Sequence, residues 1–301
     1  MKKAIVIFIA AAAVSMQAVA VERASGSITI KTSKVCRMLV KAWADAYMKE
    51  NPQASIRVVD GSSAGDGQPD LVVGDVEKGA PASVVGRYIL LPVTTKDNPA
   101  AGELQKSRLS RYDLSLLYFE QDPSEDAEEE ELSPKRKRLI ERVTVYSGNR
   151  DGSAAEHFAA ILGHKTSDLR GKKIGGDDIF LLSAIARDST GITVSNAASL
   201  YDTASRTLRA DLLVLPLKVS KEHREALESR NLDQLLAVFE RDDSDLLPAQ
   251  ALSLEVAGHP SAVAEDFSHW VATEGQRYNN QAGFLRVAAS PGNYGIAALA
   301  R

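Results

Sequence analysis

The chain has 301 residues, of which 44% are hydrophobic and 25% are charged, and its formal net charge is −4. This is the composition of an ordinary globular protein, and its charge gives no reason to expect binding to nucleic acid or to a strongly anionic membrane. The single cysteine, Cys36, excludes an internal disulfide, so we expect a small buried residue rather than a reactive thiol. The five histidines do not cluster along the chain, so we expect no metal and no cofactor.

The first 20 residues have the pattern of a secretory signal peptide. Lys2 and Lys3 precede an uncharged apolar run, Ala4–Met16, and the small residues Ala18 and Ala20 predict cleavage after Ala20. The apolar run has about 13 residues, whereas a membrane-spanning helix needs roughly 20, which weakens the alternative of a retained anchor. The sequence therefore predicts a soluble periplasmic protein whose mature length suits two lobes.

Strands and helices alternate along the first hundred residues. Apolar residues with helical spacing predict a helix over Val35–Tyr47, with Ser33 as its N-cap and Asn51-Pro52 at its end. Pro92 predicts a bend or an edge position for the strand that contains it. The predicted strands are Gly26–Ile30, Ser55–Val59, Asp70–Val73 and Tyr88–Thr94. This alternation indicates α/β architecture.

The middle of the chain has an acidic block, Glu120–Glu131, followed by a basic one, Pro134–Arg138. Such blocks are usually solvated loops or exposed helix starts. A basic ligand-binding patch is the alternative, although the neighbouring acids would neutralise it. Further strands are predicted over Val143–Tyr146, Gly191–Val194, Asp211–Leu217 and Gly283–Val287. Further helices are predicted over Ala154–Leu162, Val263–Val271 and from Asp178 through Ile185.

Two strand–loop–helix junctions have residues suited to receiving an anion. One is Thr32-Ser33, and the other is Arg150–Ser153, before the helix that begins at Ala154. A helix N-terminus offers unpaired N–H groups, serine hydroxyls add donors, and an arginine can make a two-pronged contact to an oxyanion. The alternative is that both serines only cap their helices. A third loop, Gly61–Gly65, is either an anion-binding nest or a flexible turn.

No motif of a catalytic centre is present. The sequence has no Gly-x-Ser-x-Gly elbow, no Walker phosphate loop, no His-Glu-x-x-His zinc spacing and no evident Cys–His pair. The sequence therefore favours a protein that is not an enzyme.

The order of these segments resembles the phosphate-binding protein family of ABC importers. The similarity extends over most of the mature chain, in the same order as in the family. It is carried by Ile28-Thr29-Ile30-x-x-Ser33, Trp43, Tyr47, Asn51-Pro52, Gly61–Gly65, Gly86–Pro99, Arg150–Ser153, and Phe267-x-x-Trp270 through Gly283-Phe284-Leu285.

The resemblance implies a type 2 periplasmic binding protein fold, in which two α/β lobes, each a mixed sheet flanked by helices, are joined by crossover strands. Lobe one would hold residues 21–95 and 196–301, and lobe two residues 96–195, with a charged insertion at 120–138. The protein would be a monomer that delivers phosphate or a similar oxyanion to an ABC permease in the inner membrane. The ligand-binding residues implied are Thr32, Ser33, Ser62, Ser63, Asp70, Arg150, Ser153 and Ala154.

Asp70 has a specific role in this resemblance, because it stands where the family has an acid that accepts a proton from hydrogen phosphate. The sequence also departs from the family pattern. Thr32 stands where the family has a glycine, and the segment from Gly65 to Asp70 is very short. The family has an arginine soon after the acid, whereas this chain has the stretch Gly74–Glu77. Ala154-Ala155 replaces the family's Gly-Thr. The alternative is therefore a periplasmic sensor or interaction protein that kept the scaffold with altered or lost anion binding. A hydrolase of phosphate esters is the weakest alternative, because no metal or nucleophile constellation is visible.

Overall fold

The computed structural model describes residues 24–60, 68–75, 83–106, 108–120, 134–148, 153–175 and 178–287. The predicted signal peptide lies outside the described residues, as do Ser62, Ser63 and Arg150. In the described ranges, no helix combines the length and the apolar character needed to span a bilayer.

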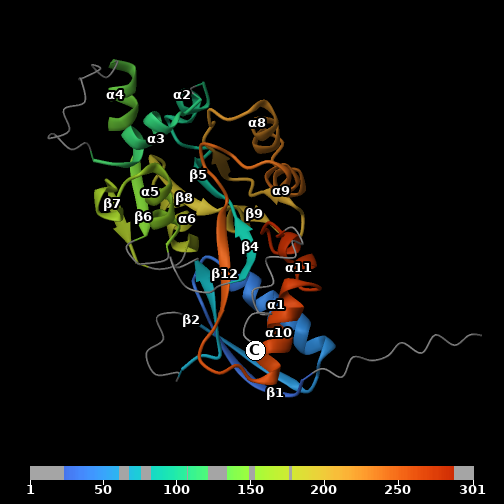
Figure 1. Cartoon of the computed structure of the whole chain (residues 1–301). Coiled ribbons are helices and arrows are strands. Elements are labelled where there is room, and N and C mark those ends of the chain that lie inside the picture. Colours follow the sequence, from blue (N-terminus) through green and yellow to red (C-terminus); the bar gives the residue numbers. More distant parts are fainter. Residues whose placement is uncertain are drawn as a thin grey trace, which may run out of the picture.

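Two five-stranded mixed sheets, each flanked by helices, form the two halves of the molecule (Figure 1). The first sheet has the order β2-β1-β3-β12-β4 and the second β11-β5-β8-β6-β7. The strands of the first sheet are β1 (Gly26–Thr32), β2 (Ala54–Asp60), β3 (Leu71–Asp75), β4 (Ser83–Tyr88) and β12 (Gln250–Val256). Those of the second sheet are β5 (Leu90–Thr95), β6 (Thr144–Gly148), β7 (Lys172–Ile174), β8 (Gly191–Asn196) and β11 (Leu212–Val214). The expected mixed sheets flanked by helices are confirmed.

Strand direction brings the two sheets together at one edge. In the first sheet β1, β2 and β3 are parallel, and β12 is antiparallel to both β3 and β4. The last residues of β1, β3 and β4 therefore lie at the same edge. The chain then passes through Ile89 into β5, where Leu90 pairs with Asn196, the last residue of β8. Because β8 is parallel to β6, the carboxyl ends of the parallel strands of both sheets face the crossing at Ile89.

The first half is held by aromatic packing between its helices. These are α1 (Arg37–Glu50), α10 (Ala262–Ala272) and α11 (Gln276–Gln281). The ring of Tyr47 lies edge-on to those of Phe267 and Trp270, with centroids 5.2 and 5.6 Å apart. Trp43 is fully buried and its Nε1 donates to Asn279 Oδ1 at 3.0 Å. The aromatic residues that carried the family resemblance are therefore core residues.

The second half has its helices on both faces of the sheet and along its edges (Figure 1). They are α2 (Ala101–Lys106), α3 (Arg111–Tyr118), α4 (Pro134–Glu141), α5 (Ala154–Leu162), α6 (Asp178–Arg187), α7 (Ala197–Leu200), α8 (Lys221–Glu228) and α9 (Leu232–Arg241). A 3₁₀ turn covers Thr166–Asp168, and a hairpin joins β9 (Tyr201–Asp202) to β10 (Thr207–Leu208). Helix α4 begins at Pro134, so the basic block is helical rather than a loop.

Several local predictions are corrected. Helix α1 begins at Arg37 with Cys36 at its N-cap position and no side-chain cap, so Ser33 is not the cap. Strand β5 lies between β11 and β8, so Pro92 is not at a sheet edge. The carbonyl of Pro92 accepts a hydrogen bond from the N–H of Leu215, just beyond the end of β11. In an antiparallel pair the N–H and the carbonyl of one residue point to the same neighbour, so the missing N–H of Pro92 is on the side of β11 and not of β8. The predicted terminal strand is only a bridge between Leu285 and Arg87.

The sheets do not follow the predicted lobe limits at residues 95 and 195. Strands β5 and β11 both belong to the second sheet, and the chain rejoins the first sheet at β12. The division into lobes stays a prediction. We propose that lobe limits following the sheets would lie near Ile89 and between Val214 and Gln250.

Candidate functional site

The facing strand ends meet at Asp75, the last residue of β3. Its Oδ1 accepts a hydrogen bond of 2.9 Å from the hydroxyl of Tyr88, the last residue of β4. Its Oδ2 lies 3.0 Å from Nε2 of His157, on helix α5 of the second half. The side chains of His157 and Asp75 are 17% and 27% exposed, so this contact between the two halves is partly shielded from water. We call Asp75, Tyr88 and His157 the junction cluster.

The loop after β1 lies beside the junction cluster. Thr32 Oγ1 and Ser33 Oγ are each 3.2 Å from the sulfur of Cys36, and the Ser33 N–H donates to the Val73 carbonyl. A Cβ added to Gly74 would lie 3.7 Å from Ser33 Cβ, so Ser33 lies next to the residue that precedes Asp75. Burial raises the pKa of the Cys36 thiol, and the hydrogen bonds with Ser33 and Thr32 oppose this only in part. The thiol is therefore protonated at neutral pH, and the expectation of a buried cysteine is confirmed.

The N-terminus of α5 approaches from the second half. Ser153 is the N-cap, and its Oγ accepts from the Glu156 N–H at 3.2 Å, so its predicted capping role is confirmed. A hydroxyl that accepts one hydrogen bond keeps its own proton to donate. A Cβ on Gly148 would lie 3.0 Å from Ser153 Cβ, so the absence of a side chain there allows the end of β6 to approach the cap. Ala154, the first helical residue, is fully buried.

Ser147, the residue before Gly148, has a buried hydroxyl. Its side chain is buried, at 3% exposed, and its Oγ has no hydrogen-bond partner in the described part of the chain. Buried polar groups are nearly always hydrogen-bonded, and an exception at a strand end indicates a place for a missing partner. Sequence reasoning placed Ser147 in the second loop without singling it out.

A second contact joins the halves near the same edge. Asn196 ends β8, is 1% exposed, and donates from Nδ2 to the Val35 carbonyl at 3.3 Å. Its Oδ1 accepts from the Ala198 N–H and so caps α7. The two halves are thus in direct contact at both Asp75 and Asn196.

Asp70 is not at this junction. It precedes β3, its Oδ2 accepts from the Thr29 N–H at 2.8 Å, and its N–H donates to the Thr29 carbonyl. Asp75 is five residues further along the chain, a distance of about 16 Å at the usual rise of a strand. The role predicted for Asp70 therefore does not fit its position, and Asp75 is the acid beside Thr32, Ser33 and the N-terminus of α5.

The junction cluster and the residues beside it supply hydroxyl, thiol, imidazole and carboxylate groups, and no lysine or arginine is among the described residues named here. In the described ranges, no group of three or more His, Cys, Asp or Glu side chains is arranged to hold a metal ion. The chemistry that these groups support is hydrogen bonding to a small polar molecule.

No protein-family model and no curated protein matches the chain. Solved structures do match. A phosphate ABC transporter substrate-binding protein from Clostridium perfringens, with bound phosphate, is 16% identical, with a TM-score of 0.58 over 87% of this chain and 100% of that one. An ABC-type phosphate transport receptor from Vibrio cholerae is 12% identical, with a TM-score of 0.55 over 87% of this chain and 100% of that one.

A protein of another class has a similar structure. The regulatory domain of CcmR from Synechocystis PCC6803, in complex with 2-PG, is 14% identical, with a TM-score of 0.51 over 82% of this chain and 96% of that one. At these identities the likeness shows the fold alone. The expected type 2 periplasmic binding protein fold is confirmed, and this fold is found in both import and regulatory proteins.

Proposed function

We propose that the chain is a periplasmic binding protein that holds phosphate, or a similar small oxyanion carrying a proton, between its two sheets and delivers it to an ABC permease. The observation that carries this proposal is the convergence of Ser33, Asp75, Ser147 and the N-terminus of α5 at facing strand ends. Open α/β sheets bind ligands outside the carboxyl ends of their strands. The solved phosphate-binding proteins of the same fold support the choice of ligand.

The ligand is held by hydrogen bonds in this proposal. Ser33, Ser147 and Ser153 supply hydroxyl donors, the N-terminus of α5 supplies N–H groups and the favourable end of its dipole, and Arg150 supplies the positive charge. Asp75 would repel a bare anion, so it selects a ligand that has a proton to donate to its carboxylate. Hydrogen phosphate and hydrogen arsenate meet this requirement at neutral pH, and sulfate does not.

Ligand binding is tested by thermal unfolding of the mature protein. Millimolar phosphate should raise the melting temperature, because a ligand that binds only the native state stabilises it by about 2.7 kcal/mol at a hundred times its Kd. Sulfate should have no effect. Arg150→Ala should abolish the shift, whereas Arg241→Ala, which removes a surface charge on α9, should leave it unchanged. Equal shifts in both variants would contradict the placement of the site.

Ser147→Ala separates the site from the scaffold. Because Ser147 Oγ has no partner in the described structure, removing it should leave the melting temperature of the ligand-free protein unchanged or slightly higher. The same change should weaken phosphate binding about tenfold or more, the loss of one hydrogen bond to a charged group. Full phosphate affinity in this variant would exclude Ser147 from the site.

A second candidate function is a periplasmic sensor or interaction protein on the same scaffold. It is favoured by the contact of Asp75 with His157, which joins the halves through the group that would otherwise face an anion. The regulatory domain among the solved neighbours has the same fold. If phosphate, arsenate, sulfate and molybdate all leave the melting temperature unchanged, this candidate replaces the first.

A further inference from the structure

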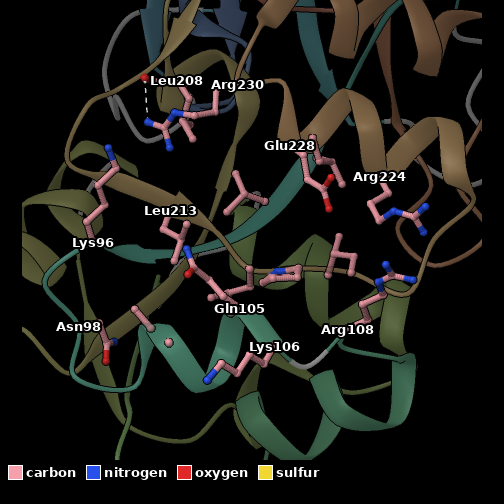
Figure 2. A pocket seen from close by; sticks show the side chains of 17 residues that line it. Lys96, Asn98, Gln105, Lys106, Arg108, Leu208, Leu213, Arg224, Glu228 and Arg230 are labelled. Carbon is pink, nitrogen blue, oxygen red and sulfur yellow. Dashed lines mark hydrogen bonds between the residues drawn. The ribbon is translucent and has the colours of Figure 1, made fainter.

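A cavity of about 860 Å³ lies in the second half of the molecule, between α2, β11 with the segment that follows it, and α8 (Figure 2). It shares no residue with the junction cluster or with any residue proposed above to bind phosphate. Small-molecule sites usually measure about 300–1,000 Å³, so the volume is that of a site for a small organic molecule.

The lining is strongly cationic. Five basic residues, Lys96, Lys106, Arg108, Arg224 and Arg230, and one acid, Glu228, line the cavity, although the whole chain has a formal net charge of −4. Figure 2 shows Lys96 on one side and Arg108 and Arg224 on the other. The wall therefore attracts a negatively charged ligand.

Arg230 has a structural role. It has a φ of 57°, and its guanidinium donates to the carbonyls of Leu208, Arg209 and Leu212 at 3.0–3.3 Å. The other four cations make no ion pair within the described part of the chain. Their charges are available to a ligand.

The floor of the cavity is apolar. It consists of the run Leu213–Leu217, with Leu208 and Leu227 beside it. Leu213, Val214 and Pro216 are half-buried, so part of their apolar surface meets water. A small inorganic anion would leave this surface wet, whereas a hydrocarbon group would cover it and gain about 25 cal/mol for each Å² removed from water.

We infer that this cavity binds an amphipathic organic anion, a carboxylate or phosphate that carries an alkyl or aryl group. The charged group lies on the side of the cavity that Arg108 and Arg224 line, with Lys96 on the opposite side, and the apolar group lies on the Leu213–Leu217 floor. Glu228 opposes the ligand's charge and limits affinity. This site is independent of the proposed phosphate site, so either can fail without the other.

The test uses octanoate as the probe, titrated calorimetrically into the mature protein. One saturable site is expected for octanoate, and none is expected at this cavity for 1-octanol, which lacks the charge, or for inorganic phosphate, which lacks the hydrocarbon chain. Equal affinity for 1-octanol and octanoate would overturn the proposal, as would the absence of saturable octanoate binding.

Gly102 offers a way to block the cavity without changing its charge. It lines the cavity on α2, and a Cβ built there meets no atom within 4 Å. Gly102→Trp should therefore fill the space and abolish octanoate binding, while Gly102→Ala should retain it. A melting temperature equal to that of the unmodified protein confirms that each variant is folded. Unchanged octanoate binding by folded Gly102→Trp would place the ligand elsewhere and refute the proposal.

Charge variants give effects of opposite sign. Arg224→Gln should weaken octanoate binding about tenfold, as expected for one lost hydrogen bond to a charged group. Glu228→Gln should strengthen binding, and Lys49→Gln, on α1 of the first half, should leave it unchanged. If a glutamate-rich peptide displaces octanoate at lower concentration than octanoate itself requires, the occupant is a protein segment and the proposal is wrong.

Discussion

At the scale of single residues, two glycines adopt positive φ for different physical reasons. Gly163 ends α5 with a φ of 87°, and a Cβ there would meet no atom within 4 Å. Gly171, before β7, has a φ of 83°, and a Cβ there would lie 2.3 Å from the Val145 carbonyl oxygen. Gly163 therefore supplies only a backbone conformation, whereas Gly171 also allows close approach to β6.

Alanine substitutions should separate these two effects. Gly163→Ala should cost about 1–2 kcal/mol of unfolding free energy, the strain of a left-handed alanine. Gly171→Ala should cost at least about 2 kcal/mol more, because the backbone of β6 must move to relieve the clash. Urea unfolding measures both losses of unfolding free energy, provided that the substitutions leave the m-value unchanged. Equal losses would show that the backbone near Val145 moves without cost.

The two acids that flank β3 show a limit of residue-level reasoning. Asp70 begins the predicted strand Asp70–Val73 and Asp75 follows it by two residues, and neither has a composition signal that marks it as functional. The end of the strand that faces the second half depends on the parallel pairing of β1 with β3 and on the crossing at Ile89. These are long-range pairings, so the choice between the two acids could not be made from the sequence.

At the scale of elements, a side-chain cap is present at the start predicted for α5, and no side-chain cap is present at the start of α1, where Ser33 was predicted to be one. Ser153 and Ser261 cap α5 and α10 through hydrogen bonds to the third helical N–H. Helix α1 has Cys36 at its N-cap without a side-chain hydrogen bond, and Ser33 instead contacts the Cys36 sulfur. A hydroxyl before an apolar run is therefore a good but not a sufficient signal.

The two capping serines provide a matched test of the proposed site. Ser153→Ala and Ser261→Ala should each lower the unfolding free energy by about 1 kcal/mol, because each leaves one helical N–H without its cap. Only Ser153→Ala should also weaken phosphate binding, since Ser261 is on a helix of the first half away from the junction cluster. If Ser153→Ala lowers the unfolding free energy but leaves phosphate affinity unchanged, Ser153 only caps α5 and does not contact the ligand.

Helix α9 was not among the predicted elements, although its signal is local. Leu232, Leu235, Leu236 and Phe239 are all buried and follow the spacing of an amphipathic helix. Strand β12 was also not predicted, although Leu252-Ser253-Leu254-Glu255-Val256 alternates apolar and polar residues, which is a local signal of a strand. Only its position between β3 and β4 depends on the folded sheet.

At the scale of the whole molecule, polar contacts join α9 to the first half on another side. Glu240 accepts from the Arg286 side chain and backbone and from Asn280 Nδ2, at 2.7–3.1 Å. Arg87 donates to the Phe239 carbonyl and pairs with Asp243. Burial alone would raise the pKa of Glu240, but the hydrogen bonds from Arg286 and Asn280 outweigh it and lower that pKa.

The lowered pKa of Glu240 predicts a pH dependence with a definite sign. The stability that its carboxylate contributes is present above the unfolded-state pKa, about 4.3 for glutamate, and is lost as the pH falls through the lower folded-state value. Glu240→Gln should therefore cost about 1 kcal/mol at pH 7, allowing for solvent screening of the exposed Arg286. The cost should shrink below about pH 4.

The unfolding free energies of the unmodified protein and of Glu240→Gln, measured at pH 7, 5 and 3.5, give the cost of the substitution at each pH. A cost that grows as the pH falls would contradict the assigned direction of the pKa. Glu103→Gln is the matched control, because its single ion pair with Arg142 is more exposed, and its effect should be small at every pH.

The sequence by itself determined the alternation of strands and helices, the cap at Ser153, the buried cysteine and the aromatic residues of the first core. These features depend on local periodicity, on hydrogen bonds within one turn, or on side-chain hydrophobicity, all of which are written along the chain. Only the tertiary structure decided that Asp75 and not Asp70 meets His157, that β5 and β11 share a sheet, and that four cations without an ion pair among the described residues line a cavity with an apolar floor. Each of these results joins residues far apart in sequence, whose relative placement is set by strand direction and packing.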